Sequence, residues 1–444
     1  MGKGLFFNIY YAIIPLLIIG MSLGYTTFLV ALIAFVPLLF LTTRHTVGFF
    51  LIMYGGPLAG VIRAMYPALP VYGILFQIIG FVLIRDLVVD LISNHSKAFL
   101  WMFFILVLFG LFYLIGPMDE WANNKYLKMC FNGTMMIFGY YVLDKSDKID
   151  AEGLTRLLFM AALCMFEYLI ETYRLVPGHL FDYNWFRDQL SIWDNENRGY
   201  ARMLITYQHI GMLIAFAIAI YLSKVKLNGP LSLFYVIIGA QLVMISGCRQ
   251  AILAIAVVLV LRFAVFKNPD QQRVQPIGRL FGMLFGLALS LIALLLFFQN
   301  VQSDIISRTL AEGDVGRQMH FMEAIAIFKD SPLVGAGIGG YHSITGNAWP
   351  HNFFLELLSE TGLIGTLALL AIILGVLTHK RIKLTYITQS DMFFFLVLVA
   401  LFVRVMVSSD LPESIELFSA VFAISATNSS LPVVSYSSQI GQYE

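Results

Sequence analysis

Charge is scarce in this chain. Only 12% of its 444 residues are Asp, Glu, Lys or Arg, whereas a soluble domain averages about 25%. Hydrophobic residues make up 59% of the chain, and the mean hydropathy is +0.81. A chain this apolar cannot cover its surface with polar groups, so most of that surface must face lipid. The formal net charge of +1 gives no indication of nucleic-acid binding.

Cysteine is scarce as well. Cys130, Cys164 and Cys248 lie in or beside apolar segments, without a CxxC motif or Cys/His spacing. We interpret them as core residues, with neither a disulfide framework nor a metal site. A small-residue cleavage pattern is also lacking near the start, so we interpret the first apolar stretch as a membrane anchor and not as a signal peptide.

Apolar runs long enough to cross a bilayer, about 17–25 residues each, recur along the whole chain. They predict an all-α integral membrane protein with about 12–14 transmembrane helices. The candidate spans are 5–24, 27–43, 47–66, 71–92, 98–116, 126–143, 154–174, 205–223, 231–247, 250–266, 280–299, 352–378, 391–408 and 413–431.

Lysine and arginine occur in alternate connections between these spans. The positive-inside tendency places those connections, and both termini, in the cytoplasm. The short connections between them are nearly free of positive charge; the segment 117–125 has only Lys125. The residues of the basic connections are Lys3, Arg44, Lys97, Lys145, Lys148, Lys224, Lys226, Lys267, Arg273, Arg279, Lys380, Arg381 and Lys383.

Two long connections fall on the opposite, outer side. Loops this long are rarely idle in a compact protein, and we expect short helices on the membrane surface there, one of them over 315–329. The predicted organisation is N-terminal transmembrane helices (1–174), an outer loop (175–204), central transmembrane helices (205–299), a large outer loop (300–350), C-terminal transmembrane helices (351–431) and a cytoplasmic tail (432–444).

Arginine is the informative residue type on the outer side, because charge in or beside a membrane is costly and tends to be functional. Arg249 follows Ser246-Gly247-Cys248 at a predicted helix start. A guanidinium group binds phosphate through two parallel hydrogen bonds, so clustered arginines indicate an anionic lipid headgroup such as a pyrophosphate. The alternative is pairing with nearby Asp or Glu, or contact with ordinary phospholipid. The outer loops add Arg174, Arg187, Arg198, Arg202, Arg308 and Arg317.

Another group of motifs lies between 330 and 365. The glycines of 330–339 have the look of GxGxxG but follow no strand, which excludes a dinucleotide site and predicts a tight loop against the membrane domain. Asn352, Glu356 and Glu360 then share one helical face. Two buried carboxylates need partners, for which arginines are the obvious candidates. His351 could accept a proton from an attacking hydroxyl, or simply hydrogen-bond a loop.

These motifs together resemble the O-antigen ligase/polymerase superfamily over roughly 246–365. The elements of the resemblance are Ser-x-x-Arg ending at Arg249, Arg317 opening an outer-loop helix, Pro-Leu-x-Gly-x-Gly from Pro332, His-Asn-x-x-Leu-Glu from His351 and Glu-Thr-Gly-Leu-Ile-Gly from Glu360.

The resemblance implies a GT-C-like glycosyltransferase of the bacterial inner membrane with a periplasmic active site. Its donor would be an undecaprenyl-diphosphate-linked oligosaccharide, used without a metal or other cofactor. The acceptor would be a second lipid-linked repeat unit, for a polymerase, or lipid A-core, for a ligase. Pro350 directly before His351 favours the polymerase. Membrane lipids are further expected partners, and the resemblance allows for a chain-length regulator.

The site predicted from these observations has three groups of residues. The catalytic group is His351, Arg249, Arg317, Glu356 and Glu360. The donor pyrophosphate is assigned to Arg249, Arg317, Arg198 and Arg202, and substrate binding to Asn352, Arg308 and Trp193. His351 is the candidate base, the two glutamates orient it or the arginines, and the transfer inverts the anomeric centre.

A polysaccharide transporter or flippase is the alternative from another class. A transporter places charged residues at the bilayer midplane, in helices that are broken at corresponding positions of two halves. This sequence shows no two-fold repeat, and its charges gather at one face. The asymmetry favours an outward-facing enzyme.

Overall fold

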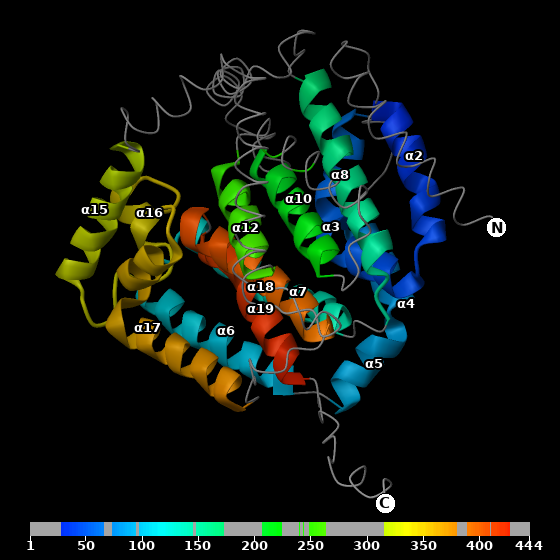
Figure 1. Ribbon diagram of the computed structural model, residues 1–444. Helices are drawn as coiled ribbons and strands as arrows, with labels where there is room; N and C mark the ends of the chain where they lie inside the picture. Colours follow the sequence, from blue (N-terminus) through cyan, green and yellow to red (C-terminus); the bar gives the residue numbers. More distant parts are fainter. Residues whose placement is uncertain are drawn as a thin grey trace, which may run out of the picture.

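The computed structural model describes residues 28–65, 73–94, 97–144, 148–172, 207–223, 239, 243, 248–262, 315–379, 389–408 and 410–426. Across these ranges the chain forms helices and turns and no β-strand, which agrees with the predicted all-α class (Figure 1). The helices are α2 (Phe28–Leu41), α3 (Arg44–Met65), α4 (Gly73–Leu83), α5 (Arg85–Asn94), α6 (Lys97–Ile115), α7 (Glu120–Asp144), α8 (Ala151–Thr172), α10 (Tyr207–Leu222), α12 (Arg249–Val260), α15 (Val315–Asp330), α16 (Gly340–Thr345), α17 (Phe353–His379), α18 (Gln389–Ser408) and α19 (Leu411–Ala426).

Helices that are distant in sequence pack side by side in a bundle. α7 packs along α19 and also contacts α3 and α6, while α8 packs against α10 and α2. α12 and α18 pack against each other and against α10. α15 and α16 lie at the left edge of Figure 1, where both contact α17. The segment from α15 to α16 therefore packs against α17 at one edge of the bundle.

Large apolar side chains lie on the outside of the bundle as well as inside it. α6 buries Met102, Ile105 and Phe109, but leaves Phe103 and Leu114 exposed by 59% and 61%. Such an apolar outer face suits lipid and not water. Two of the described helices, Lys97–Ile115 and Phe353–Val376, are long and apolar enough to cross a membrane. These features agree with an all-α membrane protein, and the larger number of spans stays a prediction.

Several predicted boundaries differ from those of the structure. The span predicted over 71–92 is divided at Ile84 into α4 and α5. α7 begins at Glu120, six residues before the predicted start at 126, so that Lys125 lies inside a helix and not in a connection. The helix predicted over 315–329 is confirmed by α15, and its position on the membrane surface stays a prediction. The spans 5–24 and 280–299 and the outer loop 175–204 lie outside the described residues.

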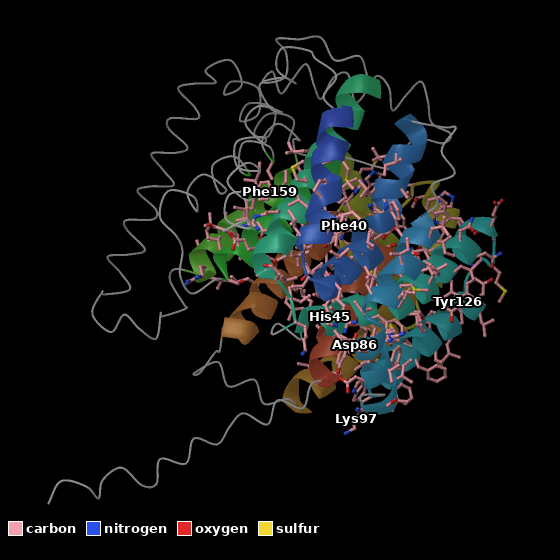
Figure 2. The ribbon with its side chains drawn as sticks, turned by 90° about the vertical axis from the view of Figure 1, so that its right-hand side faces the viewer. Phe40, His45, Asp86, Lys97, Tyr126 and Phe159 are labelled. Atoms are coloured by element: carbon pink, nitrogen blue, oxygen red, sulfur yellow. The ribbon has the colours of Figure 1, made fainter. Side chains whose placement is uncertain are left out.

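Polar contacts gather at the two ends of α7. Near its last turn, Tyr141 donates a hydrogen bond to Asp90 of α5. Beside it, His45 at the start of α3 lies 2.9 Å from Asp86 (Figure 2). Near its start, Lys125 meets the first turns of α17. The two ends of α7 thus carry separate polar groups, and the topology predicted from the basic connections stays a prediction.

Candidate functional site

α17 is interrupted at Gly362, whose backbone (φ 60°, ψ −162°) is not helical. The interruption leaves main-chain groups on both sides without partners inside the helix, and the glycine-rich loop supplies them. The pairs are Ala336 N–H to Ser359 C=O at 2.8 Å, Gly337 N–H to Glu360 C=O at 2.9 Å, Leu363 N–H to Pro332 C=O at 2.9 Å and Ile364 N–H to Leu333 C=O at 3.0 Å. The Pro-Leu-x-Gly-x-Gly and Glu-Thr-Gly motifs therefore bind each other through their backbones.

The same loop also lies against the end of α6. The backbone N–H of Ile338 donates to the Phe112 carbonyl at 3.1 Å. Gly337 has φ +79°, and a Cβ there would lie 2.2 Å from the Cα of Gly116. Only glycine fits such a close approach in the left-handed region. The predicted tight loop against the helical domain is thereby confirmed. The span predicted over 352–378 forms as α17, with one break in the helix at Gly362, where the loop inserts.

The glutamates of α17 lie inside the bundle. Glu356 and Glu360 are both fully buried, and Lys125 of α7 is only 6% exposed. The Lys125 ammonium donates to Glu356 Oε1 at 2.5 Å and to both Glu360 oxygens at 2.7 Å. The backbone N–H of Leu411 donates to the other Glu356 oxygen at 3.0 Å. This cluster ties together the starts of α7, α17 and α19.

The prediction that these glutamates share one helical face is thus confirmed. The prediction that arginines are their partners is wrong, because the partner is Lys125. The predicted span begins at 126, and this start leaves Lys125 in a connection and not inside α7. Asp119 accepts a hydrogen bond from the Ala122 N–H at 2.7 Å, as an N-cap does. An aspartate directly before Glu120 is a helix-start signal that would have placed Lys125 inside the helix.

α17 begins at Phe353, two residues after His351. Asn352 caps the helix by accepting a hydrogen bond from the Leu355 N–H at 3.1 Å. Its amide donates to the Met406 carbonyl near the end of α18, also at 3.1 Å. His351 adopts a positive φ of 56°, an uncommon backbone for a non-glycine residue. Its ring lies 5.5 Å from that of Trp349 and 5.6 Å from that of His320, centroid to centroid.

A polar cluster on α15 and α16 lies next to His351. Glu323 accepts hydrogen bonds from Tyr341 at 2.8 Å and Asn347 at 3.1 Å, and contacts His320 Nδ1 at 3.2 Å. Partial burial raises the pKa of the Glu323 carboxyl, but the hydrogen bonds from Tyr341, His320 and Asn347 outweigh burial and hold the pKa below its usual value. A small apolar core formed by Ala324, Ile327, Tyr341, Ala336 and Leu355 joins this cluster to α17.

The start of α12 faces the end of α18. Arg404 of α18 lies 3.1 Å from Glu413 and 2.5 Å from Glu416 of α19. This arginine therefore pairs with nearby acidic side chains, which is the alternative to phosphate binding. Arg404 and Gln250 line one pocket, together with apolar side chains of α3, α8 and α10. Gln250 is 5% exposed, and its side-chain oxygen has no hydrogen-bond partner among the described residues. The pocket therefore lies at the first turn of α12.

The structure brings three predicted segments to one end of the bundle. α18 connects them, because its end binds Asn352 and shares the pocket with Gln250. Arg249 and Arg317 lie in the first turns of α12 and α15, and the structure does not describe their side chains. Arg198, Arg202, Arg308 and Trp193 lie outside the described residues. Within the described ranges, no group of three or more His, Cys, Asp and Glu side chains could hold a metal ion.

The residues of these clusters that the sequence did not predict are Lys125, His320, Glu323 and Tyr341. The last three depend on contacts across 18 or more residues, between α15 and α16. The signal available was a histidine and a glutamate three residues apart in a predicted helix, which places them on neighbouring turns of one face.

Exposed apolar helices, with polar clusters gathered at their ends, define a helical membrane protein with a candidate site at one end. The model of the O-antigen ligase family matches residues 234–370, and this match supports membership of the O-antigen ligase/polymerase superfamily. It confirms the resemblance drawn from 246–365. The matched segment includes Arg249, Arg317, His320, Glu323 and His351. No curated protein and no solved structure matches the chain.

Proposed function

We propose that this protein is a glycosyltransferase that acts at the periplasmic face of the bacterial inner membrane. It takes a glycan from an undecaprenyl-diphosphate-linked donor and transfers it with inversion, without a metal ion. The family match over 234–370 supports an O-antigen ligase/polymerase type of function. The observation that carries the proposal is that the starts of α12 and α17 both lie against α18, while the α15–α16 segment packs on α17.

The donor diphosphate is assigned to Arg249 and Arg317, with Arg198 and Arg202 as further contacts. Positive charge fixed beside the departing diphosphate stabilises the negative charge that develops as the glycosidic bond breaks. Glu356 and Glu360 act at a distance in this proposal. Their carboxylates bind Lys125 inside the bundle, and so fix the first turns of α17 directly after His351.

The acceptor hydroxyl needs a group that takes its proton. His351 is the candidate that the family motif supplies, and it lies beside the polar cluster of α15 and α16. Two imidazoles, those of His351 and His320, are thus available within 5.6 Å of each other. Arg308, Trp193 and Asn352 are assigned to the sugars, although Asn352 also caps α17.

Polymerisation of O-antigen or related repeat units is the reaction we favour, on the sequence Pro350-His351-Asn352. Transfer to lipid A-core is the second candidate, supported by the description of the matched family as O-antigen ligases. Deletion of the gene followed by lipopolysaccharide electrophoresis separates them. Core carrying a single repeat indicates a polymerase, and bare core with accumulated lipid-linked polymer indicates a ligase. Repeat units retained on the cytoplasmic leaflet would indicate a transporter and contradict the proposal.

Single replacements test the site. Arg249→Ala, Arg317→Ala and His351→Ala should each abolish long-chain polysaccharide in the complemented deletion strain, while the protein stays in the membrane at its normal level. Arg44→Ala is the matched control, because Arg44 is exposed and pairs with Asp86 at the other end of the bundle. Wild-type glycan ladders in all three site variants would refute the assignment.

A further inference from the structure

Gln250, the second residue of α12, carries an unsatisfied amide oxygen inside the bundle. The residue is 5% exposed, and its Oε1 atom has no hydrogen-bond partner among the described residues. Burial of a carbonyl oxygen without a donor is costly, and native proteins keep such an atom where water or a ligand supplies the missing bond. The Gln250 oxygen therefore marks a place for a hydrogen-bond donor from outside the described chain.

This amide lines a small pocket between α3, α8, α10, α12, α18 and α19. The cavity volume is about 40 Å³. A buried water molecule needs roughly 10–15 Å³ of such space, so the pocket holds a group of about three or four heavy atoms. A whole sugar ring with its hydroxyls is larger than this. Apolar side chains form most of the lining, and they are Pro57, Met165, Met212, Leu213 and Phe216.

The charges at the pocket compensate one another. Arg404 lies 3.1 Å from Glu413 and 2.5 Å from Glu416, and the Tyr140 hydroxyl donates to Glu416 at 2.6 Å. A guanidinium that already serves two carboxylates attracts a further anion weakly, which disfavours a phosphate or a carboxylate in the pocket. The Tyr54 hydroxyl is a neutral donor on the same lining. The occupant that fits these charges is a neutral group.

Three kinds of neutral group differ in their hydrogen-bonding needs. The hydroxyls of a sugar would be buried against methionine and phenylalanine side chains, which offer them no partner. A prenyl or acyl chain would fill the apolar space and leave the Gln250 oxygen unsatisfied. An N-acetyl group has an N–H that donates to Gln250 Oε1, a carbonyl that accepts from the Tyr54 hydroxyl, and a methyl that contacts the apolar lining. The N-acetyl group alone among these uses both polar groups and the apolar space.

We propose that this pocket binds the 2-acetamido group of the donor sugar, and that Gln250 selects donors whose diphosphate-linked sugar carries this group. The inference rests on the proposed function, in which Arg249 binds the donor diphosphate. Gln250 follows Arg249 directly, and the Cα atoms of consecutive residues lie about 3.8 Å apart. In the donor, C2 is bonded to the anomeric carbon that carries the diphosphate. A substituent on C2 therefore lies next to the diphosphate, as Gln250 lies next to Arg249.

Two lipid-diphosphate-linked donors that differ only at C2 of the first sugar, acetamido in one and hydroxyl in the other, test this selection. Purified protein is assayed with each donor in proteoliposomes that contain the lipid-linked acceptor. Wild-type kcat/KM should be about 10–100-fold higher for the acetamido donor, because the hydroxyl donor leaves buried polar groups unpaired. Gln250→Leu, which removes the amide at similar size, should reduce this ratio to about threefold or less. Tyr54→Phe, a smaller change, should also lower the ratio.

Leu253→Ala is the matched control, because Leu253 is an exposed residue of the same helix, and it should keep the wild-type ratio. Equal wild-type rates with the two donors would overturn the inference, as would an unchanged ratio in both Gln250→Leu and Tyr54→Phe. An unchanged ratio together with an altered dependence on prenyl chain length would assign the pocket to the lipid and also overturn it. Wild-type protein that transfers glycan from neither donor would instead refute the proposed function itself.

Discussion

Removal of the Lys125 charge should destabilise the bundle strongly. Lys125 is the only cation that contacts Glu356 and Glu360 among the described residues, and its three N–H groups are all used in these contacts. Lys125→Met keeps a long unbranched side chain, so the volume lost from the interior is small. Among the described residues, the two fully buried carboxylates then keep only the Leu411 N–H as a donor.

The size of the effect follows from that burial. Removing one partner of a buried ion pair costs about 3–5 kcal/mol, because the remaining charge is left without compensation. The upper part of this range is expected here, since one ammonium serves two carboxylates. Replacing the whole cluster by neutral groups is often neutral or stabilising. The triple variant Lys125→Met, Glu356→Gln, Glu360→Gln should therefore recover most of the stability that Lys125→Met loses.

Unfolding of the purified protein in mixed micelles, followed by tryptophan fluorescence, measures the free-energy differences. A change of less than about 1 kcal/mol in Lys125→Met would show that the pair is not desolvated as the structure indicates. A triple variant no more stable than Lys125→Met would refute the argument from uncompensated charge.

Two further predictions concern the backbone and pH. Gly337→Ala should destabilise the protein by about 3 kcal/mol or more in the same unfolding assay. Gly346 also has a positive φ but faces open space, so Gly346→Ala should cost only about 1–2 kcal/mol. Equal losses of stability in the two variants would contradict the close approach of Gly337 to Gly116. Burial, and then the charge of Glu413, raise the pKa of Asp410 from its ordinary 3.8 to about 6. Because the fold disfavours the ionised form of Asp410, the free energy of unfolding of wild type should fall as the pH rises from 4 to 7, and more steeply than that of Asp410→Asn. Parallel profiles of unfolding free energy against pH would refute this.

Local patterns in the sequence predicted the parts of the site that depend on one helix. Residues 315–329 were expected to form a surface helix, and α15 forms there. The placement of Glu356 and Glu360 on one face follows from a spacing of four residues, and Lys125 contacts both. These inferences needed only the periodicity of a helix.

Contacts between distant segments could not be predicted from helical periodicity. The break at Gly362 depends on the insertion of the 332–338 loop, and in the sequence that glycine looks like one more small residue of an apolar helix. Lys125 finds its carboxylates 231 and 235 residues further along the chain. The His320–Glu323 pair gains its meaning only when α16 brings Tyr341 to it. Local periodicity carries no information about such pairings.

Reconstitution of the purified protein with a radiolabelled undecaprenyl-diphosphate-linked oligosaccharide, in the presence of a chelator, tests the central claim most directly. Glycan transfer predicts that free lipid diphosphate appears in step with a longer or newly attached glycan, in wild type and in Arg44→Ala but not in Arg249→Ala. An oligosaccharide that crosses the bilayer with its bond to the diphosphate intact, or that stays unchanged, would contradict it.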